Sequence, residues 1–196
     1  MTTLKLFFHD ACFDGAASAA LFAAFYRSRH PAATIVPVGL HHKLGDAFAD
    51  AAIDGDDNAC VDFRYCPHPA MRWWFDHHAT AFHPAELAAH FEARRDQQMA
   101  FEPTAPSCAG VVTRTLAARY GWTPPPHLAE LTAWADIVDA AAYPDAAELE
   151  ARVRAVHQPH LVDEIVAQAL AKHLVSAETW LALDEVLNRD ATSLRR

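Results

Sequence analysis

Short β-rich runs alternate with helical runs through the first part of the chain, and this order leaves few folds open. Strands are expected at residues 4–8, 34–38, 58–62 and 72–75. An Ala-rich helix at residues 14–29 and a short helix at residues 44–52 separate the first three strands. Because strands spaced by helices form βαβ units, the sequence predicts an α/β fold with a mainly parallel sheet flanked by helices.

The second part of the chain, from Ser107 onward, reads as almost entirely helical. The helical pattern breaks at residues 123–126, 143–144 and 158–159. A length of 196 residues, of which 52% are hydrophobic, is enough for one domain with a sizeable core. We expect one domain at residues 1–145 and a helical C-terminal segment at residues 146–196, which either ends that domain or connects it to another.

The acidic balance of the chain restricts its binding partners. The 16 Lys and Arg residues are outnumbered by 25 Asp and Glu residues, which gives a net charge of −9 at pH 7, and the Lys and Arg residues do not cluster. Binding to duplex nucleic acid depends on many cationic contacts to phosphates, so we expect no stable duplex binding. An anionic substrate would need a metal ion to attract it.

Neither the start of the chain nor its apolar stretches indicate export or membrane insertion. Residues 1–10 contain one Lys and no long apolar run, unlike a signal peptide. The longest mostly apolar stretch, residues 16–25, has about half the length that spans a bilayer. The four cysteines form no CxxC pair, and without an export signal they are expected to be reduced. These features predict a cytoplasmic protein without a membrane partner.

Three of the expected strands end on side chains that can bind a metal ion. These residues are His9 and Asp10 after the first strand, Asp62 at the end of the third, and Asp76, His77 and His78 after the fourth. Ligands of open parallel sheets bind outside the carboxyl ends of the strands, so these side chains are expected to converge. Mixed carboxylate and imidazole ligands suit Mn²⁺, Mg²⁺, Fe²⁺ or catalytic Zn²⁺ better than a closed structural zinc site.

The same residues belong to four ordered motifs. Residues 9–15 read HDACFDG and are followed by AASA, residues 61–63 read VDF, residues 75–78 read FDHH, and residues 136–139 read DIVD. In this order the motifs resemble those of the DHH phosphoesterase superfamily, over about residues 4–145. That superfamily includes single-strand exonucleases, nanoRNA and cyclic-dinucleotide phosphodiesterases, exopolyphosphatases and family II inorganic pyrophosphatases.

The resemblance implies a two-metal hydrolase, usually dependent on manganese. Asp62 would bridge both ions and His9 would bind one of them. The other ion would be bound by Asp14, His77 and Asp139. The resemblance also implies that His78 faces the phosphate and that Asp76 orients its neighbours. Two cations at such a site clamp the attacking and leaving oxygens, which would let an acidic protein bind a phosphate ester.

The first motif departs from the family pattern at Cys12. Family members usually have a metal-binding carboxylate two residues before Asp14, and this chain has a thiol there. Either Asp10 or the Cys12 thiolate replaces that carboxylate, or one metal position is weakened. The last option would give a catalytically degenerate module that binds metal or nucleotide without turnover, and a purely structural metal-binding domain is a third possibility.

The second departure concerns substrate binding. Catalytic relatives generally carry a smaller C-terminal domain with a Gly-rich, basic motif, which this sequence lacks, and residues 161–187 resemble the connector to such a domain. Phosphate contacts would then come from the metal ions and from scattered groups such as Arg64, Lys43 and Arg114. We expect a small phosphorylated substrate or a short oligonucleotide, with a second domain or partner subunit improving its binding.

Several of the acidic candidates also have ordinary structural interpretations. Asp62 alone could be an ordinary turn residue that ends a strand. Asp14 precedes a helix and would make a good N-cap. Asp136 and Asp139 are three residues apart and share a helix face, so one of them is expected to be solvated. Asp139 is the expected ligand, because the segment that it opens resembles the fourth family motif more closely.

Three further groups carry weaker signals. His41, His42 and Lys43 follow the second strand and are interpreted as incidental loop residues. Residues 54–58 (DGDDN) lack the spacing of an EF-hand and are expected to form a turn before a strand. Residues 107–110 open a helix whose N-terminus could receive a phosphate oxygen, although helix capping is the expected role.

Overall fold

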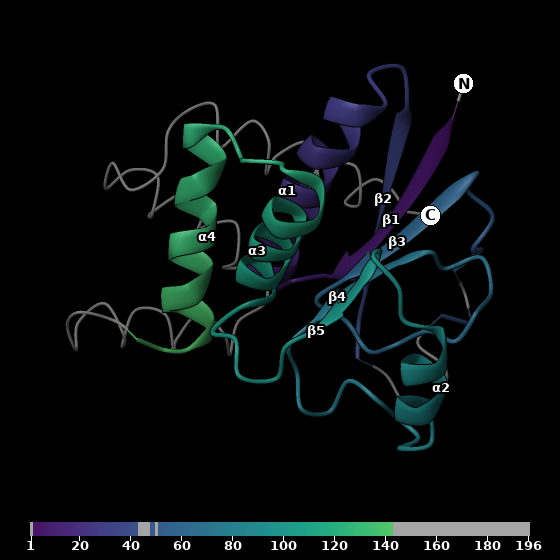
Figure 1. Cartoon of the computed structure of the whole chain (residues 1–196). Helices are drawn as coiled ribbons and strands as arrows, with labels where there is room; N and C mark the ends of the chain where they lie inside the picture. Colours follow the sequence, from purple (N-terminus) through teal and green to yellow (C-terminus); the bar gives the residue numbers. More distant parts are fainter. Residues whose placement is uncertain (1, 43–47, 50, 143–196) are drawn as a thin grey trace.

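A computed structural model describes residues 2–42, 48, 49 and 51–142, and within this part of the chain five strands form one fully parallel sheet (Figure 1). The predicted α/β fold with a parallel sheet is therefore confirmed. The order of the strands across the sheet is β2-β1-β3-β4-β5. In chain order they are β1 (Thr3–His9), β2 (Thr34–Leu40), β3 (Asp57–Val61), β4 (Trp73–Asp76) and β5 (Met99–Phe101).

The described residues also form four helices that cover both faces of the sheet. They are α1 (Phe13–Arg29), α2 (Leu87–Arg94), α3 (Cys108–Tyr120) and α4 (Pro126–Asp139). Helices α1, α3 and α4 pack against one another on one face, and α2 lies on the other (Figure 1). None of these four helices combines the length and the apolar character needed to cross a bilayer.

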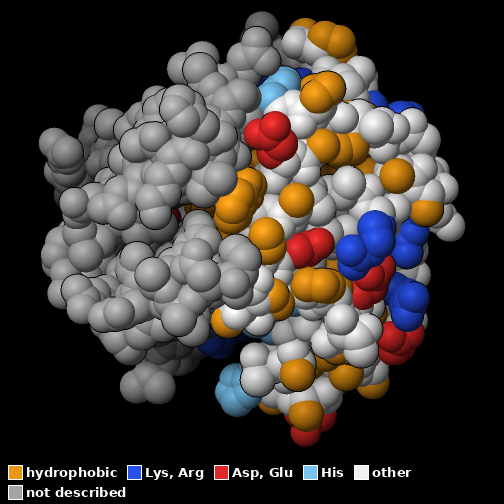
Figure 2. Space-filling model, turned by 90° about the vertical axis from the view of Figure 1, so that its left-hand side faces the viewer, with side chains coloured by type: hydrophobic (Ala, Val, Ile, Leu, Met, Phe, Trp, Pro, Cys, Tyr) orange, Lys and Arg blue, Asp and Glu red, His pale blue; other side chains and the backbone are white. Residues whose placement is uncertain are grey.

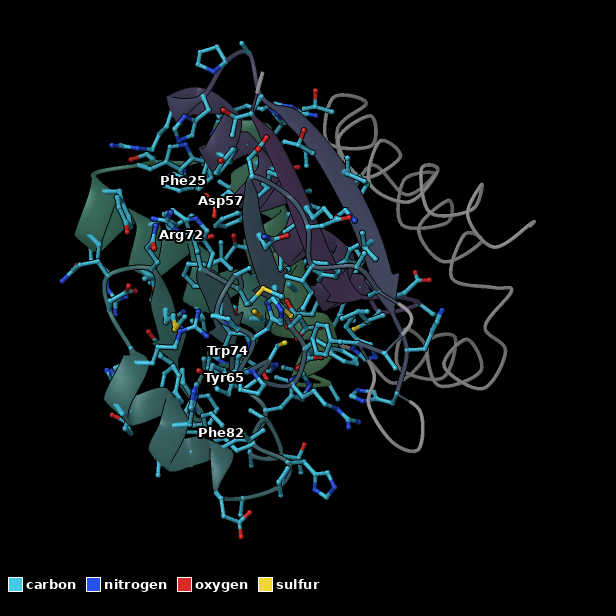
Figure 3. The ribbon with its side chains drawn as sticks, turned by 90° about the vertical axis from the view of Figure 1, so that its right-hand side faces the viewer. Phe25, Asp57, Tyr65, Arg72, Trp74 and Phe82 are labelled. Atoms are coloured by element: carbon cyan, nitrogen blue, oxygen red, sulfur yellow. The ribbon has the colours of Figure 1, made fainter. Side chains whose placement is uncertain are left out.

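Strand β1 shows how the side chains are divided between two hydrophobic clusters. Leu6 and Phe8 pack with the α1, α3 and α4 layer, whereas Phe7 points to the opposite face. On that opposite face the rings of Tyr65 and Trp74 meet edge to face at a centroid distance of 5.1 Å, close to α2 (Figure 3). Burial on both faces explains why the strands read as short apolar runs that end abruptly on polar residues.

The junction between β1 and α1 is unusually tight. A Cβ added to Gly15 would overlap the backbone oxygen of His9, so a glycine is required for α1 to begin this close to the end of β1. The turn between them passes through Ala11, whose φ of 55° lies in the left-handed region. This close approach brings the first turn of α1 next to the carboxyl end of β1.

Helix α3 has defined caps at both ends. The Oγ of Ser107 accepts a hydrogen bond from the backbone N–H of Gly110 at 3.0 Å. At the other end Gly121 has a φ of 65° and its N–H donates to the carbonyl of Ala117. The predicted break at residues 123–126 is confirmed, since it separates α3 from α4, although α4 already begins at Pro126.

All four expected strands are present, and the second extends two residues further than predicted, to Leu40. Strand β5 and helix α2 have no counterpart in the prediction, because three residues and eight residues carry too little periodicity. The expected helix at residues 44–52 falls mostly outside the described residues, and residues 48 and 49 form a turn. The breaks at 143–144 and 158–159, residues 161–187 and the segment 146–196 also lie outside the described residues.

Candidate metal centre

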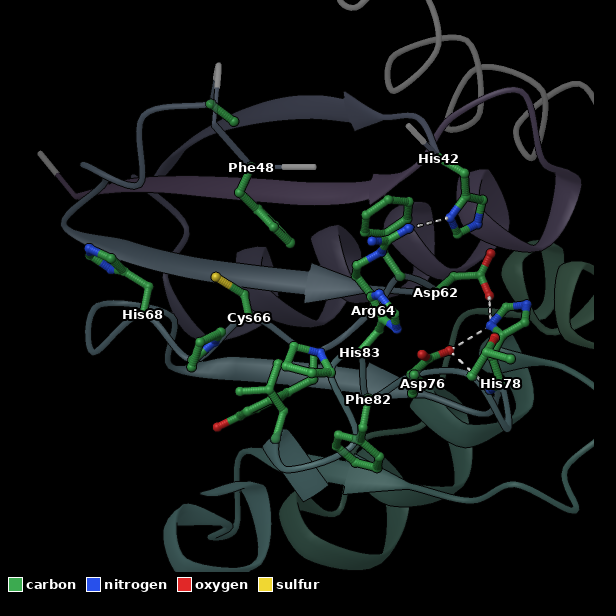
Figure 4. Close-up of a pocket in the computed structure, with 18 of the residues that line it drawn as sticks. His42, Phe48, Asp62, Arg64, Cys66, His68, Asp76, His78, Phe82 and His83 are labelled. Carbon is green, nitrogen blue, oxygen red and sulfur yellow. Dashed lines mark hydrogen bonds and ion pairs between the residues drawn. The ribbon is translucent and has the colours of Figure 1, made fainter. Parts of the chain in front are cut away.

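The polar residues that end the strands meet at one edge of the sheet. Strands β1, β3 and β4 are direct neighbours and run parallel, so their carboxyl ends lie side by side. His9 is the last residue of β1, Asp62 follows β3 directly, and Asp76 is the last residue of β4. Figure 4 shows Asp62, Asp76 and His78 pointing toward one another at this edge.

Asp62 lies at the centre of the cluster and is 1% exposed. Its Oδ2 lies 3.6 Å from Nδ1 of His9, and its Oδ1 lies 3.8 Å from Nε2 of His77 and 3.7 Å from Nδ1 of His78. The two oxygens of one carboxylate therefore face different imidazoles. Asp62 has a φ of 55°, a conformation that costs free energy for most residues and is tolerated by Asp more readily.

Asp14, His77 and Asp139 form a second group from α1, the end of β4 and the end of α4. Nε2 of His77 lies 3.5 Å from Oδ2 of Asp14 and 3.2 Å from Oδ2 of Asp139. The Nδ1 of His77 is 2.9 Å from the carbonyl of Ala105, which fixes the ring so that Nε2 faces the carboxylates. Asp139, the last residue of α4, thus reaches the carboxyl ends of the strands.

Asp14 is held in place by the N-terminus of α3. The backbone N–H of Cys108 donates to Oδ2 at 2.6 Å, and that of Ala109 donates to Oδ1 at 2.9 Å. The interpretation of Asp14 as the N-cap of its own helix is wrong, because Cys12 is the N-cap of α1. The capping role expected for residues 107–110 is found, and the N–H groups of Cys108 and Ala109 are occupied by Asp14 rather than open to a phosphate oxygen.

Asp76 organises the loop that carries the two histidines. Its Oδ1 accepts from the backbone N–H of His77 at 2.8 Å and of His78 at 3.2 Å, and it lies 2.7 Å from Nδ1 of His78. One buried carboxylate therefore fixes both the backbone of the loop and the ring of His78.

The remaining acidic candidates lie outside the cluster. Oδ1 of Asp136 accepts from Oγ of Ser107 at 2.5 Å, so this carboxylate links α4 to the N-cap of α3. Oδ2 of Asp10 lies 3.2 Å from Nε2 of His41. Neither Asp136 nor Asp10 belongs to the groups of potential ligands among the described residues.

Cys12 lies inside the cluster and forms a group with His9 and Asp62. One potential ligand atom from each of these three residues lies within 4.8 Å of the others. Burial, followed by the charge of Asp62, raises the pKa of the Cys12 thiol. All four cysteines are thiols, as expected, and Cys12 is the one that is not fully buried.

The atoms that face the centre of the cluster lack hydrogen-bond partners. In the part of the chain that the structure describes, the buried side-chain atoms without a partner are His9 Nδ1, both oxygens of Asp62, Asp76 Oδ2 and His77 Nε2. Leaving such an atom unpaired costs about 1–3 kcal/mol. A divalent ion with ligand bonds of about 2.1 Å holds neighbouring ligand atoms about 3 Å apart, close to the separations of 3.2–3.8 Å seen here. These residues therefore fit a metal ion.

The electrostatics of the cluster also indicate a need for positive charge. Burial, together with Asp14 and other carboxylates, raises the pKa of Asp62 well above its usual value, and burial raises the pKa of Asp14 to about 6. Burial lowers the pKa of His9 to about 4. Burial also opposes the charged form of His77, but contacts with Asp139 and other acceptors outweigh it and raise the pKa to about 9. A metal ion bound here would supply the positive charge that these buried carboxylates lack.

A groove of about 1280 Å³ extends from the cluster across the α2 face of the sheet (Figure 4). Asp62, Asp76 and His78 line its inner end. Its walls are largely aromatic and apolar, and they include Phe63, Tyr65 and Phe82. The groove offers a binding surface that continues directly from the candidate ligands.

His42 and Arg64 both line this groove, and their contact with each other was not expected from the sequence. The ring of His42 stacks on Phe63 at a centroid distance of 4.8 Å, and a guanidinium nitrogen of Arg64 lies 3.4 Å from Nδ1 of His42. The structure therefore places His42 in the groove, whereas the sequence indicated no role beyond that of an incidental loop residue. Its position after β2, beside the end of β1, was the available signal.

The other weaker candidates have structural roles or lie elsewhere. Arg114 does not line the groove and pairs with Glu102 at 2.8 Å. Residues 54–56 lead into β3 through a bend at the opposite end of the sheet from the cluster, and Asp57 and Asn58 already belong to the strand. Lys43 lies outside the described residues.

Comparison with protein-family models, curated proteins and solved structures finds no match for this chain. What the structure establishes is a parallel α/β sheet with buried His, Asp and Cys groups that could hold metal ions. The resemblance to a family therefore depends on the four motifs and on the fact that the fold brings them to one place.

Proposed function

We propose that this chain is a two-metal phosphoesterase of the DHH superfamily that hydrolyses a phosphodiester or phosphoanhydride bond. The observation that carries the proposal is the position of Asp62. Its two oxygens face different histidines and lack hydrogen-bond partners among the described residues. A bridging ligand between two divalent ions requires a carboxylate in such a position.

The chain provides a group of ligands on each side of Asp62. His9 and Cys12 form one group with Asp62, while Asp14 and Asp139 form another with His77. A third group, of Asp62, His77 and His78, connects the other two. We propose Mn²⁺ as the metal, following the resemblance, with Mg²⁺, Fe²⁺ and Zn²⁺ as alternatives that the same donor atoms accept. When bound, two such ions would stabilise the charge on the attacking and leaving oxygens of the phosphate.

His78 is proposed to act on the phosphate directly. Its Nδ1 is engaged by Asp76, and this contact raises the pKa of His78 despite partial burial. With Nδ1 occupied by Asp76, the protonated ring would present Nε2 to the groove that His78 lines. From there it would donate a hydrogen bond to a phosphate oxygen or a proton to the leaving group.

The groove is proposed to bind the rest of a small phosphorylated substrate or a short oligonucleotide. Phe82, whose side chain is partly exposed, offers an aromatic surface in the groove on which a base could stack, and Arg64 offers a cation near the inner end. Long nucleic acid is not the proposed substrate. In the space-filling view of one face, basic side chains at the right-hand edge alternate with acidic ones (Figure 2). We propose that a second domain or partner subunit supplies further binding energy, which would raise turnover as well as affinity.

A catalytically degenerate module is the alternative proposal, and Cys12 is the observation that favours it. A thiol replaces the carboxylate that the resemblance leads us to expect, and burial raises the pKa of this thiol. If Cys12 does not ligate, one metal position retains only His9 and Asp62. Such a protein would bind metal or nucleotide without turnover.

Hydrolysis of bis(p-nitrophenyl) phosphate with added Mn²⁺ separates the two proposals. We expect metal-dependent release of nitrophenol by the wild type and a loss of about 100-fold or more in Asp62→Asn. Asp54→Asn is the matched control, since Asp54 is an acidic residue at the opposite end of the sheet and pairs with Lys5. Metal binding without hydrolysis would overturn the enzyme proposal and favour the degenerate module.

A further inference from the structure

The two ligand groups differ in the softness of their donor atoms. On one side of Asp62 the donors are an imidazole nitrogen of His9, the sulfur of Cys12 and a carboxylate oxygen of Asp62 itself. On the other side, Asp14 and Asp139 provide oxygens and His77 provides a nitrogen, without any sulfur. These two groups have no residue in common, and only the first contains a sulfur ligand. They therefore present different chemistry to a metal ion.

We infer that the centre is heteronuclear: the His9, Cys12 and Asp62 position selects Zn²⁺, and the Asp14, His77 and Asp139 position selects a harder ion such as Mn²⁺. This inference rests on the proposed two-metal centre and names the ions that its halves prefer. Thiolate ligands favour Zn²⁺ over Mn²⁺, whereas carboxylate-rich positions suit Mn²⁺ and Mg²⁺.

The backbone around Cys12 directs its side chain into the cluster. Cys12 is the N-cap residue of α1, with an extended backbone (φ −127°, ψ 132°), and its side chain makes no capping hydrogen bond. The preceding Ala11 turns the chain with a positive φ, and the following Gly15 lets α1 approach the end of β1.

The buried atoms opposite Cys12 provide an independent reason to place an ion there. Within the described residues, Nδ1 of His9 and both oxygens of Asp62 are buried and lack hydrogen-bond partners. They belong to the same group as the Cys12 sulfur. An ion bound by all three would satisfy the nitrogen and one of the oxygens.

Cys108 illustrates how a purely structural thiol behaves in this protein. It is completely buried, and its sulfur lies 3.2 Å from the carbonyl oxygen of Phe75, to which it donates. Cys60 and Cys66 are likewise buried, in the cluster on the α2 face. Cys12 differs from all three in its partial exposure and in its position among potential ligands.

Cobalt substitution tests this inference directly, because a thiolate bound to Co²⁺ gives a sulfur-to-metal charge-transfer absorption. We expect this band in the wild type and in Cys66→Ala, and its loss in Cys12→Ser. Circular dichroism of each variant establishes that it is folded. A band that persists in folded Cys12→Ser would overturn the inference while leaving a two-metal centre possible.

Metal competition provides the second test. The protein is equilibrated with Zn²⁺ and Mn²⁺ together, and the bound ions are counted by elemental analysis. We expect one equivalent of each in the wild type, and in Cys12→Asp a fall of about tenfold or more in the preference of one position for Zn²⁺. Two equivalents of Mn²⁺ in the wild type would overturn this inference but not the proposed two-metal centre. Failure of the wild type to bind any divalent ion would overturn the proposed two-metal centre and this inference with it.

Discussion

Nε2 of His77 lies 3.2 Å from Oδ2 of Asp139, although the first residue follows the fourth strand and the second ends the last described helix. This contact joins the sheet edge to the helical layer. Asp14 approaches the same nitrogen from α1, at 3.5 Å. The candidate centre is therefore built from both layers of the fold, and it depends on how α1, α3 and α4 pack onto the sheet.

The Gly15→Ala variant is expected to disturb the centre through the backbone. The added Cβ would overlap the carbonyl oxygen of His9, so α1 or the end of β1 must move. We expect a loss of about 1–3 kcal/mol in the free energy of unfolding and weaker metal binding. Chemical denaturation and metal titration measure the two effects.

Gly121→Ala is the control for this variant. Gly121 has a φ of 65°, so an alanine there is also strained, but no atom lies within 4 Å of the added Cβ. We expect a stability loss of about 1 kcal/mol with unchanged metal affinity. Equal loss of metal affinity in both variants would show that the β1–α1 junction does not position the ligands.

Metal binding should release protons near neutral pH. The pKa of His77 is raised to about 9 by its contacts with Asp139 and other acceptors, which outweigh burial, so its ring is protonated at pH 7 in the metal-free protein. Ligation through Nε2 requires the neutral ring. The affinity for Mn²⁺ should therefore rise with pH up to about pH 9.

Calorimetry in two buffers of different ionisation enthalpy measures the number of protons released. His9 should contribute none, because burial lowers its pKa to about 4 and it is already neutral at pH 7. At least one released proton is expected from His77, whose pKa is raised to about 9. Affinity that is independent of pH between 6 and 9 would count against His77 as a ligand.

His78→Ala should separate catalysis from metal binding. His78 lines the groove and is tied to Asp76 through Nδ1. It belongs only to the group of potential ligands with Asp62 and His77, so its removal leaves the His9 group and the Asp139 group intact. We expect kcat to fall about 100-fold while the number of bound ions stays the same. His30→Gln, at the far end of α1, is a control that should retain the wild-type kcat. An unchanged kcat in His78→Ala would remove this residue from the proposed mechanism.

The strand ends were the most predictable part of the site. Each of β1, β3 and β4 is a short buried run that stops on His or Asp, and the parallel topology alone brings such ends together. The order of the strands across the sheet could not be predicted from the sequence in the same way. The sequence pattern does not specify that β1 lies between β2 and β3, and β5 is too short to give a periodic signal.

Contacts between distant segments could not be predicted from the sequence. Asp14 resembles an N-cap locally, and only the arrival of the α3 N-terminus gives its carboxylate the N–H donors of Cys108 and Ala109. Asp136 and Asp139 share a helix face, and the hydrogen bond from Ser107 to Asp136 distinguishes them. His42 becomes part of the groove because Phe63 provides a ring on which it stacks.

The central claim is that Asp62 joins two metal positions, and elemental analysis of bound metal after equilibration with Mn²⁺ tests it most directly. The wild type is expected to retain two equivalents of divalent metal, and Asp62→Ala is expected to lose both, because each of its oxygens faces a different group. Asp136→Asn, which alters only the contact with Ser107, should keep both. An unchanged metal content in folded Asp62→Ala would contradict the account.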